Sequence, residues 1–235
     1  MCSIVILRQS DSEWPLIIGA NRDEMVSRKC LPPGKHWDDR PHVFAGKDLE
    51  AGGTWLGIND YGVVCGIMNR INTLGTDPNK RSRGELVLDA LDHADANESL
   101  NAIVEIEKNS YRGFNMLIAD NTNAYWIKSS EDSEVIEYFN IPDGLSMITA
   151  YDRNDIDSKR IWIQEEKLLK KGYDFQKSLS DFLDMSNFLN HFKSNIDCSS
   201  NPFLNDDDGP ILLEEGVTIM AVSYTHLTLP TNREV

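Results

Sequence analysis

The chain has 235 residues, of which 40% are hydrophobic and 9% aromatic. These values predict a globular protein with a sizeable core rather than a disordered chain. A formal net charge of −15 argues against nucleic acid or an anionic membrane surface as a partner. The apolar runs are too short to span a bilayer, and no secretory signal is visible, so we expect no membrane insertion.

The four cysteines, Cys2, Cys30, Cys65 and Cys198, are far apart and form no Cys-x-x-Cys pair. This spacing predicts neither disulfides nor a zinc site, and it favours a reducing compartment, the cytoplasm. The glycine-rich stretch at residues 52–66 is not followed by the Lys-Ser/Thr pair of a phosphate loop. We therefore expect no metal and no cofactor.

Residues 3–8 form an apolar run that predicts a buried strand, and Cys2 opens it. The initiator Met1 is normally removed when residue 2 is small, which leaves Cys2 with a thiol and a free α-amine. That amine has a pKa of about 7.7–8.0, so it can take the thiol proton near neutral pH. The alternative is a small buried residue at a strand start, a common position for free cysteine.

Residues 15–20 predict a second strand, joined to the first by a turn and running into four polar residues, Asn21, Arg22, Asp23 and Glu24. If the two strands pair, Asp23 comes close to Cys2 and could hold its ammonium group. Arg22 could bind a substrate carboxylate, or pair with Asp23 or Glu24. The alternative is a surface charge cluster at a strand end.

Residues 27–42 contain three prolines and predict a loop, followed by a short strand at 43–46 and a hairpin over 52–69. Asn69 ends the last of these strands. An Asn side-chain N–H aimed at a pocket is a good oxyanion donor, although an Asx turn is the commoner role for Asn at such a position.

After a polar loop at 71–82, apolar periodicity predicts one helix starting near Ser82 and a second over 97–109. Four strands follow, over residues 111–120, 124–128, 133–139 and 144–150. Two more helices are predicted, from residue 157 to Gly172 and over 178–193, before an acidic loop at 197–210. This order predicts an α+β fold, a four-layer αββα sandwich of antiparallel sheets flanked by helix pairs.

Residues 222–231 resemble the translation of a sequencing adaptor. We therefore expect a single domain over residues 1–221, truncated at its C-terminal end, and exclude residues 222–235 from the fold.

Several motifs occur in a characteristic order. They are Met1-Cys2, Asn21 to Glu24, Gly52-Gly53-Thr54-Trp55-Leu56-Gly57, Asn69, Arg83-Gly84-Glu85-Leu86 and Gly113-Phe114-Asn115. In this order they resemble the NRDE family, also called the transport and Golgi organisation protein 2 family. The resemblance covers residues 1–221 and implies the fold of N-terminal-nucleophile hydrolases. The nearest chemistry is that of the cholylglycine hydrolase and penicillin V acylase group.

The resemblance implies a cysteine hydrolase of a small-molecule C–N amide bond. Cys2 would be the nucleophile, Asp23 the amine holder and Asn69 an oxyanion donor, with substrate bound by Asn21, Arg22 and Trp55. Two positions depart from the acylase pattern, because Ala20 replaces an Arg and neither Thr149 nor Ala150 is the expected Asn. The alternative is a non-catalytic binding or trafficking protein acting in Golgi organisation or in haem or lipid-metabolite handling.

Overall fold

A computed structural model describes residues 2–11, 15–25, 28–75, 77–158, 211–212 and 217–227. The chain divides into two compact units, Met1–Asn154 with Pro210–Val235, and Asp155–Gly209. In the second unit the described residues 155–158 form a turn, in which the Ser158 amide donates to the Asp155 carbonyl at 3.1 Å. The two sheets, and the helices described below, belong to the first unit.

The first sheet has five strands in the order β10-β1-β2-β12-β11. They are β1 (Ser3–Arg8), β2 (Leu16–Met25), β10 (Gly144–Ile148), β11 (Ile211–Leu212) and β12 (Val217–Leu227). The predicted hairpin is confirmed, because β1 and β2 pair antiparallel with Ser3 opposite Asn21. β12 pairs parallel with β2, so this sheet is not wholly antiparallel. β12 also spans residue 221, and the domain boundary there stays a prediction.

The second sheet has seven antiparallel strands in chain order. They are β3 (Cys30–Gly34), β4 (Val43–Asp48), β5 (Leu56–Asn59), β6 (Val64–Asn69), β7 (Phe114–Ala119), β8 (Ala124–Ser129) and β9 (Glu137–Asn140). Between β6 and β7 the chain forms helices α1 (Gly84–Leu91) and α2 (Ala96–Val104) and the 3₁₀ turn η1 (Lys108–Ser110). The Asp95 side chain caps α2 by accepting from the amides of Asn97 and Glu98.

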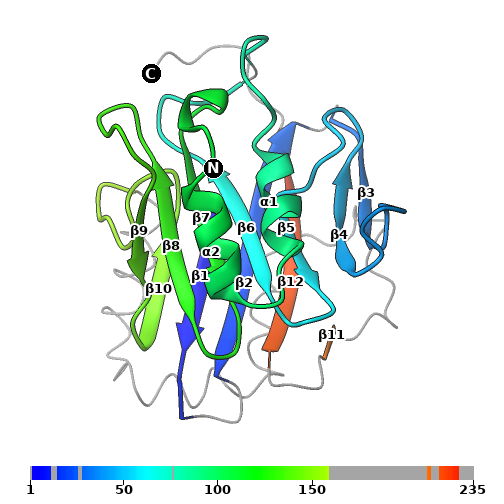
Figure 1. Ribbon diagram of the computed structural model, residues 1–235, viewed down its shortest axis with the longest axis vertical. Coiled ribbons are helices and arrows are strands. Elements are labelled where there is room, and N and C mark those ends of the chain that lie inside the picture. The colour runs from blue at the N-terminus through cyan, green and yellow to red at the C-terminus, as the bar shows by residue number, and fades with distance from the viewer. Residues whose placement is uncertain are drawn as a thin grey trace. The chain divides into compact units, whose positions relative to one another are not determined.

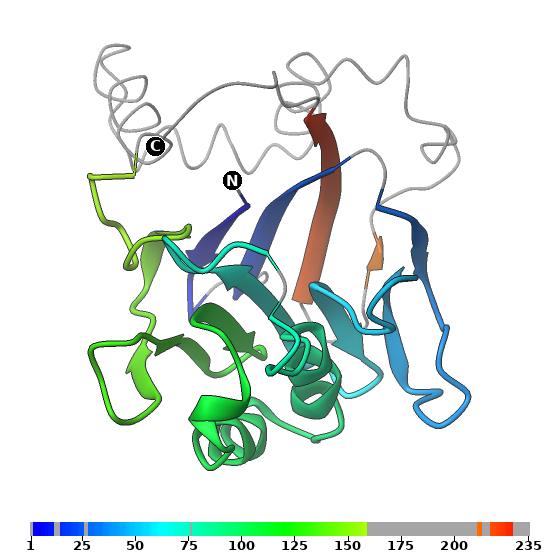
Figure 2. The same ribbon diagram turned by 90° about the horizontal axis from the view of Figure 1, so that it is seen from above.

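These elements stack as a helix layer, the seven-stranded sheet and the five-stranded sheet (Figures 1 and 2). Strand alternation divides the buried side chains between two cores. In β6, Cys65 and Ile67 pack beneath the helices, whereas Val64 and Met68 face the other sheet. Both faces of the seven-stranded sheet are therefore buried, which explains why its central strands are nearly continuous apolar runs.

The α+β sandwich is confirmed, and its strands pair antiparallel except for β12 with β2, with further corrections at several elements. The predicted loop at 27–42 contains β3, whose Pro32 and Pro33 are tolerated because β3 is an edge strand. The second helix ends at Val104 instead of 109, and the strand predicted at 133–139 is β9, residues 137–140. The two helices predicted after residue 157 lie outside the described residues.

Gly53 and Gly84 lie where two backbone segments touch. The Thr54 amide donates to the Gly84 carbonyl at 3.2 Å, joining the segment before β5 to the start of α1. A Cβ on Gly53 would lie 2.5 Å from the Gly84 carbonyl carbon and 2.7 Å from its oxygen. Two of the sequence motifs therefore contain glycine because they pack against each other.

Gly53→Ala is expected to lower the free energy of unfolding by about 1–3 kcal/mol, because the clash is with backbone that cannot rotate away. Urea unfolding measures this effect. Gly34→Ala is the control, since its Cβ would meet only the rotatable His36 ring at 3.0 Å. Equal stability of the Gly53→Ala and Gly34→Ala variants would contradict the close approach as the reason for Gly53.

Candidate active site

Cys2 lies immediately before β1, half-buried, and packs against the core between the two sheets. It lines a pocket of about 10 Å³, which is room for roughly one water molecule. Both sheets contribute to the lining, which consists of Cys2, Ser3, Ile4, Ala20, Arg22, Trp55, Leu56, Ile67 and Met68. Three of the predicted site residues, Cys2, Arg22 and Trp55, therefore meet in one place.

Gly66 in β6 allows the two sheets to approach beside this pocket. A Cβ on Gly66 would lie 2.7 Å from Cδ1 of Ile4, two residues after Cys2 in the chain. The absence of a side chain at Gly66 therefore makes room for β1.

The guanidinium of Arg22 covers the Trp55 ring at 4.0 Å from the ring centroid. Its Nη2 also pairs with Glu24 Oε2 at 3.1 Å, and Arg22 is only 7% exposed. One of the predicted alternatives, pairing of Arg22 with Glu24, is confirmed. Stacking and ion pairing together fix the guanidinium at the wall of the Cys2 pocket.

A chain of charges continues from Glu24 toward the seven-stranded sheet. Glu24 lies 3.8 Å from Arg28, and Arg28 donates to Asp48 Oδ2 at 2.6 Å. Burial raises the pKa of the Asp48 carboxyl, but hydrogen bonds from Arg28 and the Glu50 amide outweigh burial and lower that pKa below its usual value. The end of β2 is thus tied to the end of β4 by alternating charges.

The predicted residues Asn21 and Asp23 lie in β2, which continues through the whole polar motif to Met25. Asn21 pairs with Ser3, so the register carried on by one residue places Cys2 opposite Arg22. The backbone of Asp23 therefore lies one residue beyond that position. The side chains of Asn21 and Asp23 lie outside the described part, so their roles stay predictions.

Asn69 ends β6 in the seven-stranded sheet, whereas Cys2 and Asp23 belong to the five-stranded sheet. Asn69 therefore lies in a different sheet from the strands that carry the other two predicted catalytic residues. The β6 residue before it, Met68, lines the Cys2 pocket. Asn69 pairs with Phe114, which packs beneath the helices, so its Cβ shares that face. Its oxyanion role stays a prediction.

Sequence reasoning did not assign a role to Asn115, which is fully buried in β7. Its amide nitrogen donates to the carbonyls of Thr149 at 2.8 Å and Tyr151 at 2.7 Å. Its oxygen accepts from Arg70 at 2.7 Å and from the Trp126 indole at 3.2 Å. All four hydrogen-bonding positions of the amide are used. An Asn inside an apolar strand was the available signal, since buried polar groups need partners.

The Asn115 network holds the segment that passes beside Cys2. Ile148 of β10 pairs with Ile4, so the residues after it run past Ser3 and Cys2. Arg70 also binds Asp152 at 2.7 Å, and Lys128 binds the same carboxylate at 3.1 Å. Burial raises the pKa of Asp152, but the hydrogen bonds from Arg70 and Lys128 outweigh it and lower the pKa.

Among the described residues, no group of three or more His, Cys, Asp or Glu side chains is placed to hold a metal ion. Within the same residues, none of the helices combines the length and apolar character needed to cross a bilayer.

A family model described as Transport and Golgi organisation 2 matches residues 1–192 of the 235. The chain belongs to the Transport and Golgi organisation 2 family. Two family relatives, homologues from Mus musculus and Bos taurus, are 36% identical over 117 residues and 34% identical over 133 residues. These matches cover 47% and 55% of this chain, and 41% and 45% of the relatives. The chain thus spans less than half the length of these relatives.

Among solved structures, this member of the Transport and Golgi organisation 2 family is similar to an N-acylethanolamine-hydrolyzing acid amidase ortholog from Caenorhabditis elegans. The TM-score is 0.50 at 14% identity, over 65% of this chain and 70% of that one. A C2A mutant of conjugated bile acid hydrolase from Clostridium perfringens matches at a TM-score of 0.42 and 12% identity, over 62% and 53% of the two chains. The likeness to the amidase ortholog confirms the fold that the family resemblance implied.

Proposed function

We propose that the protein is a cysteine hydrolase that cleaves a small-molecule C–N amide bond with Cys2 as nucleophile. One observation carries the proposal: Cys2 heads β1 and lines an inter-sheet pocket together with Arg22 and Trp55. The likeness in fold to the amidase supports amide hydrolysis as the reaction class. It does not identify the substrate.

The proposed reaction needs no group beyond Cys2 and water for its covalent steps. The α-amine takes the thiol proton, and the sulfur adds to the amide carbonyl carbon. The C–N bond then breaks as the proton passes to the leaving nitrogen, which leaves an acyl thioester on Cys2. Water, deprotonated by the same amine, adds to the thioester carbonyl carbon. The C–S bond then breaks, the Cys2 sulfur takes the proton back from the amine, and the acid leaves. Asp23 would hold the amine. Asn69 is the predicted oxyanion donor, and because its Cβ lies on the helix-facing side, its amide would have to reach Cys2 around the end of β6.

Arg22 and Trp55 supply the proposed substrate contacts. The fixed guanidinium presents positive charge at the pocket wall, so a substrate carboxylate or polarised carbonyl would bind there. At about 10 Å³ the pocket holds no substrate as it stands, so entry requires a lining side chain to move. Ala20, in place of the acylase-pattern Arg, and Thr149 and Ala150, in place of the expected Asn, favour the second candidate function, a binding or trafficking protein without turnover.

Incubation of intact full-length protein with a panel of acyl amides tests the proposal. We expect the mass of an acyl group on Cys2 and release of free amine. Cys2→Ala should lower amine release by at least about a thousandfold, because the nucleophile is lost. Asn69→Ala tests the oxyanion role separately, since it should slow acylation without preventing alkylation of Cys2.

Intact mass provides the decisive control for this assay. Purified protein is expected to lack Met1, because residue 2 is small and heads a buried strand. Only without Met1 does Cys2 carry the free amine. Quantitative retention of Met1, or amine release that survives Cys2→Ala, would refute the mechanism and leave the binding function.

A further inference from the structure

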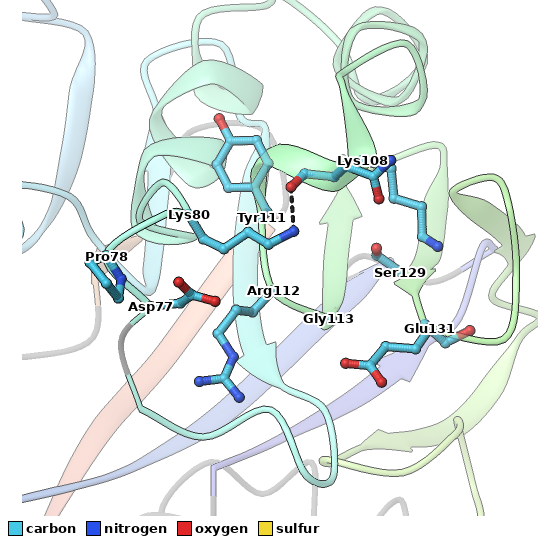
Figure 3. Close-up of a pocket in the computed structure, with 11 residues that line it drawn as sticks. Asp77, Pro78, Lys80, Lys108, Tyr111, Arg112, Gly113, Ser129 and Glu131 are labelled. Carbon is cyan, nitrogen blue, oxygen red and sulfur yellow. Dashed lines mark hydrogen bonds between the residues drawn. The ribbon is translucent and has the colours of Figure 1, made fainter.

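A second and larger pocket, of about 390 Å³, lies beside the start of β7 and the end of β8 (Figure 3). Its walls are the segment at 77–80, the residues from η1 to the start of β7, and the turn after β8. The volume lies within the range of small-ligand sites. The lining is mainly polar and contains three cationic side chains, Lys80, Lys108 and Arg112.

Two of these cations are held by backbone carbonyls. The ammonium of Lys80 donates to the Asn109 carbonyl, and that of Lys108 donates to the Ser133 carbonyl. A hydrogen bond to a carbonyl oxygen positions each ammonium group without neutralising its charge. Both lysines therefore contribute positive potential to the pocket.

Arg112 differs from the lysines because, within the part of the chain that the structure describes, its guanidinium makes no hydrogen bond or ion pair. Figure 3 shows Arg112 between Asp77 on one side and Glu131 on the other. Arg112 is half-buried, so its five donors are only partly open to water. Such a planar fork fits a carboxylate or phosphate.

Arg83 adds a second guanidinium to the same region. It donates to the Thr73 carbonyl at 3.0 Å and to the Gly113 carbonyl at 2.9 Å, and no described carboxylate pairs with it. Burial and the nearby positive charge of Arg112 lower the pKa of Arg83 to about 10. The chain has 38 acidic and 23 basic residues, yet among the described residues neither of these two neighbouring arginines forms an ion pair with a carboxylate.

We propose that this pocket is a binding site for a small oxyanion, a carboxylate or phosphate group, held by Arg112 with Lys80 and Lys108 beside it. The arrangement is independent of Cys2, because the two pockets share no lining residue. Asp77 and Glu131 lie at the same pocket and oppose the anion, so they limit its affinity.

Calorimetric titration of the full chain with inorganic phosphate, and separately with succinate, at constant ionic strength tests the site. We expect saturable binding of at least one probe, and the stronger probe identifies the preferred oxyanion. Arg112→Gln should weaken binding by about tenfold or more, since charge-assisted hydrogen bonds are lost. Glu131→Gln should tighten binding several-fold by removing an opposing charge.

Lys35→Gln is the matched control for net charge, because Lys35 pairs with Asp60 and does not line the pocket. It should bind as the wild type does. The Glu131→Gln titration keeps the test decisive if Arg112→Gln fails to fold. The proposal is overturned by wild-type protein that binds neither probe saturably, by unchanged binding in Arg112→Gln or Glu131→Gln, or by equal loss in Lys35→Gln.

Discussion

Asn115→Leu is expected to lower the free energy of unfolding by about 3 kcal/mol or more, the largest stability effect among the changes considered. The substitution removes the donors to the Thr149 and Tyr151 carbonyls and the acceptor of Arg70. Buried polar groups that lose their partners each cost about 1–3 kcal/mol. Urea unfolding followed by circular dichroism gives the measurement.

Asn140→Leu is the matched control for this variant. Asn140 ends the edge strand β9 and is exposed, so the same chemical change should alter stability by only about 0.5 kcal/mol. If Asn115→Leu were as stable as Asn140→Leu, the hydrogen-bond network of Asn115 would make no net contribution to the free energy of unfolding, and the prediction would be wrong.

The strands with strong local signals could be predicted from sequence. β6 and β7 are nearly continuous apolar runs, because one face of each strand packs against the helices and the other against the second sheet. The hairpin of β1 and β2 is equally local. β3 was missed because Pro32 and Pro33 indicate a loop, and only pairing with β4 makes this stretch an edge strand.

The site was predictable only in part, because its contacts cross between sheets. Arg22 and Glu24 are two residues apart in one strand, so their pairing was a local inference. The sheet to which Asn69 belongs depends instead on how the whole chain stacks. Asn115 joins Arg70 and Thr149, which are 45 and 34 residues away, and no spacing rule connects such positions.

At neutral pH, iodoacetamide is expected to alkylate Cys2 at least about a hundred times faster than Cys65. The reason is that the surroundings of Cys2 favour its thiolate form, whereas those of Cys65 disfavour it. Once Met1 is absent, the α-ammonium lies on the same residue as the Cys2 thiol, and a positive charge there favours the reactive thiolate. Cys65 has no exposed surface, and burial raises the pKa of its thiol well above the usual value. Peptide mapping over a time course gives both rates.

Comparing the rate of Cys2 labelling in the wild type and in Asp23→Ala tests the predicted role of Asp23. Asp23→Ala should slow labelling of Cys2, because the ammonium is no longer held beside the sulfur. Labelling of Cys30, a half-buried cysteine at the head of β3, should stay the same in both proteins. If Cys2 is unreactive in both, with Met1 absent by intact mass, the thiol is not activated. The binding function is then favoured for the inter-sheet pocket. The oxyanion site at Arg112 is tested separately, by the phosphate and succinate titrations.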